Sequence, residues 1–247
     1  MSEVIINKRF CGPKASANGG CAAGVLAKAV GGRALEVTLK SPPPLGEPIS
    51  IRQSGAGAYD AFHRETLIAT IAPGTVAIDP PPLPSDADIA AAHDAYVRDE
   101  AMTLIYPYCF VCGKKRQADD GLHIFAGAAP ESPVNADFWT PASSLADEDG
   151  LVGAEYLWGA LDCPGAFALR MDDAFVLLGR FTAEIKRRPK PGETLIVAAW
   201  RTGQDGRKHF SSSALYDEDR ALIAAANAVW IELSDPAMVA RLKAENV

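Results

Sequence analysis

Short apolar stretches bounded by turn residues recur along this chain, and most of them have the length of a β-strand. They are rich in β-branched, aromatic and small apolar residues, and turn signals such as RTGQDG and DEDR separate them. One set lies near the N-terminus and a longer set lies near the C-terminus. The predicted strands cover residues 48–53, 58–64, 66–72, 194–200, 207–216 and 221–233, with a leading hairpin at 121–127 and 135–140.

A helical pattern precedes each set of strands. The first, SANGGCAAGVLAKAVGG, is rich in alanine; Asn18 is its expected N-cap, and the glycine pair at 31–32 is expected to end it. The second lies within residues 147–169. Asp149 is its candidate N-cap, and Pro164 is expected to end or bend it.

Two further helices are predicted outside these units. The proline-rich segment DPPPLPSD forms a stiff linker, and residues 86–102 after it have the pattern of an amphipathic connecting helix. The C-terminal residues 234–247 predict a short helix capped by Ser234 or Asp235.

The two units show internal repetition. Segments 34–51 and 180–197 align without a gap at a constant offset of 146 residues, and both read as strand, proline-rich turn, Gly-Glu and strand, which indicates a duplication. A sheet that wraps one apolar helix is a stable α+β arrangement. We therefore expect one unit at 1–80, a linker with a helix at 81–104, and a second unit at 105–247. The matched pairs include Lys40 with Lys186, Pro43 with Pro189, Gly46 with Gly192, and Glu47 with Glu193.

Composition narrows the class of protein. Of 247 residues, 48% are hydrophobic and 22% are charged, which is ordinary for a globular protein. The net charge of −7 argues against general nucleic-acid binding, because phosphate recognition needs a basic surface. No apolar run approaches the roughly 20 residues of a membrane span, and the first residues do not resemble a signal peptide. We therefore expect a cytoplasmic protein whose five cysteines are thiols.

Cys109 and Cys112 form a C-x-x-C motif that could indicate zinc, a redox pair or a structural loop. Structural zinc sites usually have four ligands, and no second pair follows; Cys163 and His123 could complete a site only if the fold brought them there. A thioredoxin-like motif should open a helix, whereas a polar loop follows here. The sequence therefore favours a structural loop and predicts no metal.

Two passages carry a resemblance to a known family. NGGCAAGVLAKAV resembles the first-half helix start of the double-hotdog acyl-CoA thioesterases, and EYLWGALDCPG resembles their second-half helix, which carries a catalytic aspartate. The wider pattern CFVCG, DGL, LDCPG and GRK is also similar to bacterial thioesterase-like hotdog proteins of unassigned function. The resemblance implies a duplicated hotdog fold, a dimer of double hotdogs, and a small-molecule acyl thioester as substrate. It implies no cofactor beyond coenzyme A as part of that substrate.

Asp162 is the sharpest candidate for chemistry. It lies in an apolar helix, where a carboxylate is costly without partners, and a period of 3.6 places it on one face with Glu155 and Trp158. The resemblance assigns Asp162 to water activation. It also implies a supporting hydroxyl, which falls near Leu178 with Thr182 as the nearest hydroxyl residue, and a supporting amide, for which Asn227 is the candidate.

A thioester also needs donors for the developing oxyanion. A helix N-terminus has unpaired N–H groups and the positive end of the helix dipole, and glycine allows close approach of a substrate. Gly19, Gly20 and the Cys21 amide are the candidates in the first half, with Gly150 and Gly153 in the second. Tight helix packing is the alternative explanation for the Gly-Gly pair.

Coenzyme A carries phosphates, so an acyl-CoA site needs local positive charge. The predicted substrate-binding cluster is Lys186, Arg187 and Arg188, with Trp158 lining the acyl side. The alternative function is a non-catalytic protein that binds an acyl thioester or an apolar ligand. Cys163 could serve as a nucleophile, but no histidine has a position that implies it as partner.

Overall fold

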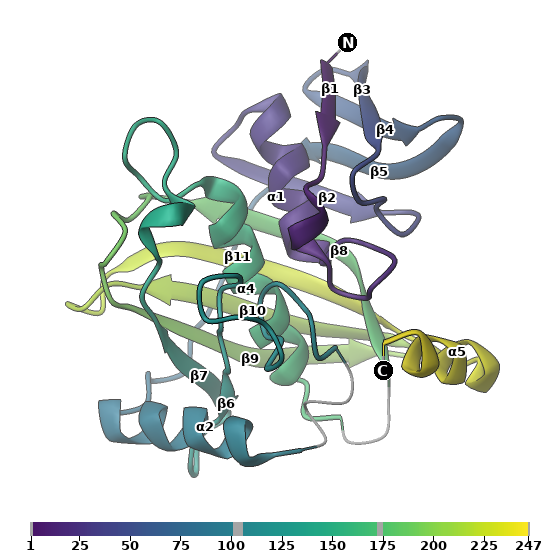
Figure 1. Ribbon diagram of the computed structural model, residues 1–247. Helices are drawn as coiled ribbons and strands as arrows, with labels where there is room; N and C mark the ends of the chain where they lie inside the picture. The colour runs from purple at the N-terminus through teal and green to yellow at the C-terminus, as the bar shows by residue number, and fades with distance from the viewer. Residues whose placement is uncertain (1, 101–105, 172–174, 247) are drawn as a thin grey trace.

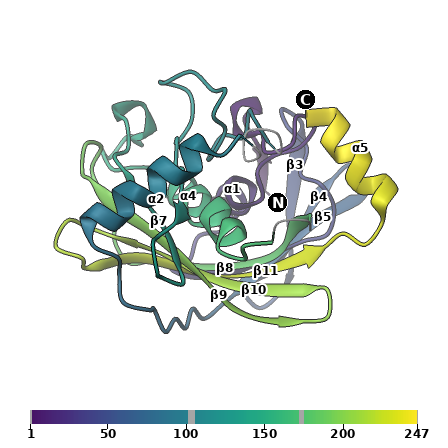
Figure 2. The same cartoon turned by 90° about the horizontal axis from the view of Figure 1, so that it is seen from below.

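The computed structural model describes residues 2–100, 106–171 and 175–246, and it consists of one large sheet with helices packed against it (Figures 1 and 2). The helices are α1 (Gly19–Val30), α2 (Asp86–Arg98), α4 (Ala154–Phe167) and α5 (Pro236–Asn246), with 3-10 turns η1 (Lys8–Phe10) and η2 (Ser143–Leu145). The strands are β1 (Ser2–Ile5), β2 (Ala34–Leu39), β3 (Pro48–Gly55), β4 (Ala58–His63), β5 (Thr66–Pro73), β6 (Gly127–Ala128), β7 (Val134–Trp139), β8 (Val176–Ile185), β9 (Leu195–Asp205), β10 (Lys208–Tyr216) and β11 (Leu222–Glu232).

Among the residues that the structure describes, all strand pairs are antiparallel, and eleven strands form a single sheet in the order β1-β3-β4-β5-β2-β8-β11-β10-β9-β7-β6. The first five strands come from residues 2–73 and the other six from residues 127–232. These spans lie within the first and last of the three predicted segments. The predicted α+β double hotdog, with two helices on one continuous antiparallel sheet, is confirmed.

The two halves join where β2 pairs with β8. In this register Glu36 lies opposite Thr182, and these two positions are also 146 residues apart, which is the offset of the sequence repeat. Equivalent residues of the two copies therefore meet each other, as residues on a twofold axis do. The Thr182 hydroxyl donates to Glu36 Oε2 at 3.4 Å across this axis.

The helices α1 and α4, one from each half of the chain, pack across each other on one face of the sheet (Figure 2). Glycines make the crossing tight: a Cβ on Gly24 would lie 2.7 Å from Glu155 Cα, and one on Gly159 would lie 2.7 Å from Cys21 Sγ. The main core fills this face, while a second cluster around Ile89 of α2 uses alternate positions of β9 on the other face. The helices therefore bury their shared surface rather than opening a broad channel.

Several local predictions need correction. Asn18 and Gly31 cap α1 as expected, but α4 begins after Gly153, so Asp149 is not its N-cap; the Asp149 carboxylate instead accepts from the Leu151 amide. α4 continues through Pro164 to Phe167.

The predicted strand at 121–127 is wrong over most of its length, because only its last residue, Gly127, belongs to a strand, the two-residue β6. Its partner strand, β7, forms as predicted. The connecting helix ends at Arg98, and the last two residues predicted for it, 101–102, lie outside the described residues. The C-terminal helix forms, with Asp235 Oδ1 accepting from the Ala237 amide. Within the described ranges, no helix is both long and apolar enough to span a membrane.

Candidate functional site

Asp162 of α4 meets the N-terminus of α1 at one end of the helix crossing. The Gly20 amide donates a hydrogen bond of 3.0 Å to Asp162 Oδ2. The residue is only 3% exposed, and its other oxygen, Oδ1, is buried without a hydrogen-bond partner among the described residues. A carboxylate from one half of the chain thus faces a helix N-terminus from the other half, and this contact joins two residues that were predicted separately from the sequence as site candidates.

The sequence NGG produces this contact. The Asn18 side chain accepts the Cys21 amide at 2.9 Å and so fixes the first turn of α1. Gly20 has no Cβ, and a Cβ there would collide with Asp162 Cβ and lie 2.7 Å from the Trp158 carbonyl oxygen. Tight helix packing, the alternative explanation for the Gly-Gly pair, therefore holds at Gly20, the same residue that donates to Asp162.

Burial raises the pKa of Asp162 to about 7, against the opposing effect of the Gly20 hydrogen bond. The nearby Cys109 raises it further, and the Asn18 side chain lowers it. A carboxyl group with such a pKa exchanges protons in the range where general acid–base catalysis is effective.

The first turn of α1 offers one further donor. The Cys21 amide is committed to the Asn18 cap and the Gly20 amide to Asp162. Gly19 is partly exposed, and no hydrogen bond from its amide is found in the described part of the chain. Among the predicted oxyanion donors, Gly19 is therefore the one whose N–H is available to a substrate oxygen.

Thr182 and Asn227 are not brought to Asp162. Asn227 pairs with Ser212 and binds the Ala77 backbone, whereas the next residue of β10, Ser213, donates to the Leu161 carbonyl of α4 at 2.7 Å. Because successive strand residues alternate between faces, Asn227 lies on the face away from α4. Thr182 is its register partner on β8 and binds Glu36. The hydroxyl groups that face α4 belong to Ser211 and Ser213, and neither residue was predicted from the sequence.

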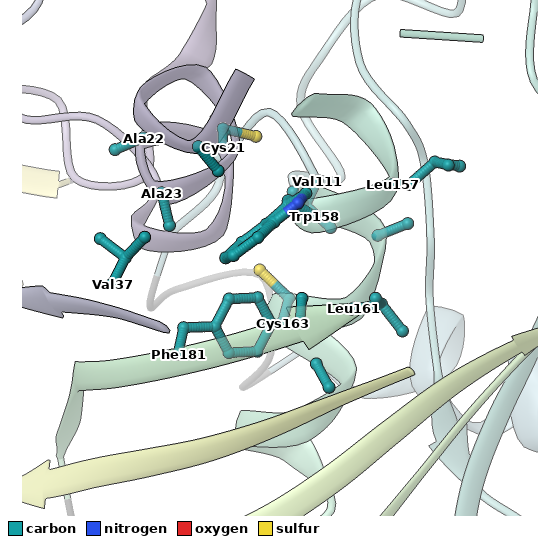
Figure 3. Close-up of a cluster of buried hydrophobic side chains, with 14 of the residues drawn as sticks. Cys21, Ala22, Ala23, Val37, Val111, Leu157, Trp158, Leu161, Cys163 and Phe181 are labelled. Carbon is teal, nitrogen blue, oxygen red and sulfur yellow. The ribbon is translucent and has the colours of Figure 1, made fainter. Parts of the chain in front are cut away.

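A cavity of about 340 Å³ lies at the other end of the helix crossing, where α1 ends and α4 begins. It brings together Trp158 and the predicted basic cluster. In Figure 3, Trp158 extends from α4 toward α1, and its ring contacts Phe181 at a centroid distance of 5.6 Å. The cavity is lined by Ala27, Lys28, Gly31, Gly32, Arg33, Leu151, Ala154, Trp158, Ile185, Lys186, Arg187 and Arg188.

Carboxylates hold most of these cations in place. Arg188 contacts Asp147 and Asp149 at 2.9 and 2.8 Å, and Lys28 contacts Asp147 and Glu155 at 2.8 and 3.0 Å. The ion pairs fix the geometry of the cavity and lower its positive potential. This end of the helix pair is therefore an ordered cluster of ion pairs rather than a strongly cationic surface.

Three cysteines gather beside Asp162. The sulfur atoms of Cys109, Cys112 and Cys163 lie within 4.8 Å of one another, so the C-x-x-C pair that looked isolated in the sequence has a third member. His123, the other residue that could have joined, binds the Gln117 carbonyl instead. Hydrogen bonds from Cys112 and Cys163 hold the pKa of Cys109 well below its usual value, and the pKa of Cys163 is raised by the same contacts. A thiol of raised pKa does not favour Cys163 as a nucleophile.

The sheet order and the helix crossing define a double hotdog protein, and solved structures share this fold. A candidate thioesterase II from Thermobifida fusca gives a TM-score of 0.59 at 15% identity over 94% of this chain and 91% of that chain. A conserved protein of unknown function with hot dog fold from Alicyclobacillus acidocaldarius gives 0.57 at 12% identity over 94% and 93%. The acyl-CoA thioesterase II TesB2 from Mycobacterium marinum gives 0.55 at 11% identity over 95% and 93%. No protein-family profile matches the sequence, and no curated protein does.

Proposed function

We propose that this protein hydrolyses acyl thioesters at the meeting point of Asp162 and the α1 N-terminus. The observation that carries the proposal is the contact between the Asp162 carboxylate of the second half and the Gly20 amide of the first. A water-activating base and an oxyanion donor are the two requirements of thioester hydrolysis, and this contact holds the Asp162 carboxylate beside the first turn of α1, where the Gly19 amide is the remaining donor. The double hotdog neighbours described as thioesterases support the same reaction.

The chemistry follows from the free atoms of the site. Asp162 Oδ1 accepts a proton from water, and the water oxygen bonds to the thioester carbonyl carbon. The Gly19 amide and the positive end of the α1 dipole stabilise the oxyanion. The carbon–sulfur bond then breaks, and the leaving thiolate takes the proton from Asp162. The products are a carboxylic acid and a thiol.

Acyl-CoA is the substrate class that fits the second end of the helix pair. Lys186 and Arg188 line a cavity beside Trp158, which lies one helical turn before Asp162, or about 6 Å along the axis. A phosphate-bearing carrier held there has its thioester directed along α4 toward the acid, and the tight contact between α1 and α4 must open to admit it. The active form proposed is a dimer of double hotdogs.

Thiol release from a panel of acyl-CoA esters tests the proposal. Wild type is expected to hydrolyse at least one of them, and Asp162→Asn is expected to lower kcat by about 10²–10⁴-fold, because the amide keeps the shape but cannot accept the proton. Full activity of the Asp162→Asn variant would rule out Asp162 as the base.

One observation favours a second candidate, a non-catalytic acyl-thioester binding protein. Asp162 is sealed from solvent, and Thr182 and Asn227 lie on the other face of the sheet. Such a protein binds acyl-CoA, as measured by calorimetry, and releases no thiol. Binding with turnover supports the hydrolase, and binding without turnover supports this alternative.

A further inference from the structure

The cysteine cluster beside α4 has the dimensions of a metal site. The sulfur atoms of Cys109 and Cys163 are 3.7 Å apart. Zinc binds thiolate at about 2.3 Å with tetrahedral geometry, which places two ligand sulfurs about 3.8 Å apart. Cys112 completes a trio within 4.8 Å. Two chain segments that are 54 residues apart in sequence at Cys109 and Cys163 thus converge to a spacing that suits one ion.

The loop that carries the first two cysteines is built to hold them together. The Cys109 amide donates to the Tyr106 carbonyl at 3.0 Å, and the Gly113 amide donates to the Cys109 carbonyl at 2.9 Å, which makes a tight turn around the C-x-x-C. A Cβ on Gly113 would lie 2.6 Å from the Cys109 nitrogen, so only glycine fits. The segment CFVCG therefore forms a tight turn that holds the thiols of Cys109 and Cys112 close together.

The remaining side of the cluster faces a polar side chain. The Asn18 Nδ2 amide donates to Cys163 Sγ at 3.5 Å and to Cys109 Sγ at 3.8 Å, and such hydrogen bonds stabilise the thiolate form of both sulfurs. Asn18 is itself buried. The three cysteines are 1%, 6% and 9% exposed in chain order, so the centre is closed to solvent as structural zinc sites are.

We propose that Cys109, Cys112 and Cys163 bind a zinc ion, and that the Asn18 amide donates hydrogen bonds to two of the three thiolates. The three thiols lose their protons to solvent as the ion enters. The ion then ties the loop before β6 to the C-terminal half of α4, independently of whether Asp162 performs catalysis.

A disulfide explains the cluster less well. A bond between Cys109 and Cys163 would require the sulfurs to move from 3.7 Å to about 2.0 Å and would leave the third thiol without a role. Convergence of all three thiols at similar spacing is what a shared ligand requires. Thiol alkylation followed by mass spectrometry of protein purified without reductant separates the two: a linked Cys109–Cys163 peptide overturns the zinc site.

Zinc content is the direct test. Wild type produced with zinc in the medium and purified under reductant without chelator is expected to contain about one zinc per chain. Cys109→Ser, Cys112→Ser and Cys163→Ser are each expected to lose most of it. Cys11→Ser is the matched control and should keep it, because Cys11 is half-buried and lies outside the trio. Wild type without zinc, or with zinc retained in all three variants, overturns the proposal.

Cobalt substitution keeps the test decisive if a serine variant fails to fold. Wild type treated with chelator and reloaded with Co²⁺ should show thiolate-to-cobalt charge-transfer absorption together with the visible bands of a tetrahedral ion. Chelation should also lower the melting temperature, and zinc should restore it. A cobalt spectrum without thiolate absorption, or a melting temperature indifferent to chelator and zinc, overturns the site.

Discussion

The two ends of the α1–α4 crossing share one architecture and differ in chemistry. At the closed end, the α1 N-terminus meets a sealed carboxylate, Asp162, beside three thiols. At the open end, the α4 N-terminus lies beside a cavity of about 340 Å³, where Lys28 bridges Asp147 and Glu155. Equivalent helix ends of a duplicated fold thus differ in charge and solvent access, and the residues next to each helix terminus determine this difference.

The largest expected contrast concerns the two carboxylates of α4. Asp162→Asn at the closed end should lower kcat by about 10²–10⁴-fold, because the base is lost. Glu155→Gln at the open end should change kcat by less than about tenfold, since it removes only a partly solvated ion pair with Lys28. Steady-state acyl-CoA hydrolysis measures kcat for both variants. Equal losses of kcat would show that the two ends of the helix pair do not differ in catalysis.

The next contrast concerns packing at the closed end. Gly20→Ala places a methyl group against Asp162 Cβ and the Trp158 carbonyl, and should destabilise the fold by about 1–3 kcal/mol. Gly203→Ala is the control, because its Cβ would lie 3.6 Å from Phe210, an ordinary contact. Urea denaturation gives both free energies. A Gly20→Ala variant as stable as Gly203→Ala would show that the helices can separate without cost.

A smaller effect is expected from the cations of the open end. Lys186→Ala should raise KM for acyl-CoA by up to about tenfold with little change in kcat, because it removes uniform binding of a phosphate. The difference should shrink at high salt. Lys208→Ala, an exposed cation on β10 outside the cavity, should leave KM unchanged. An unchanged KM in the Lys186→Ala variant would contradict the proposal that the cavity binds a phosphate of coenzyme A.

The smallest effect concerns acid stability at the open end. A hydrogen bond from the Leu151 amide, together with Arg188, lowers the pKa of Asp149. The carboxylate therefore contributes stability above its unfolded pKa, and that contribution is lost as the pH falls through its folded pKa. Between about pH 5 and about pH 3, the melting temperature of Asp149→Asn should fall slightly less than that of wild type. An identical fall in melting temperature for the two proteins would show that the Asp149 carboxylate does not contribute to the loss of stability in acid.

The sequence predicts well what local chemistry determines. The strands of the second half, the Asn18 cap and the Gly31 end follow from residue type and spacing alone. The resemblance singled out Asp162 and Gly20 separately, and only the structure shows their contact. The face of the sheet on which a strand residue lies is harder to predict, because a shift of one residue in the register exchanges the two faces. Thr182 and Asn227 were predicted near Asp162 but lie on the sheet face away from α4 for that reason.

Contacts between residues that are distant in the sequence could not be predicted from it. Cys163 joins Cys109 only because α4 crosses above the loop, and no local spacing encodes a contact over 54 residues. The predicted strand at 121–127 fails for a similar reason, since the Leu122 and Ile124 amides donate to the Phe110 and Val111 carbonyls of the cysteine loop.

The seam between β2 and β8 has a consequence for how such a protein can evolve. In a symmetric dimer of identical single units, every substitution appears at both helix ends, so a change that improves one end is imposed on the other. Here Glu36 faces its own repeat partner, Thr182, within one chain, and two different residues already occupy the axis. A fused pair can therefore specialise its ends separately, placing an acid at one and cations at the other without either burdening its counterpart.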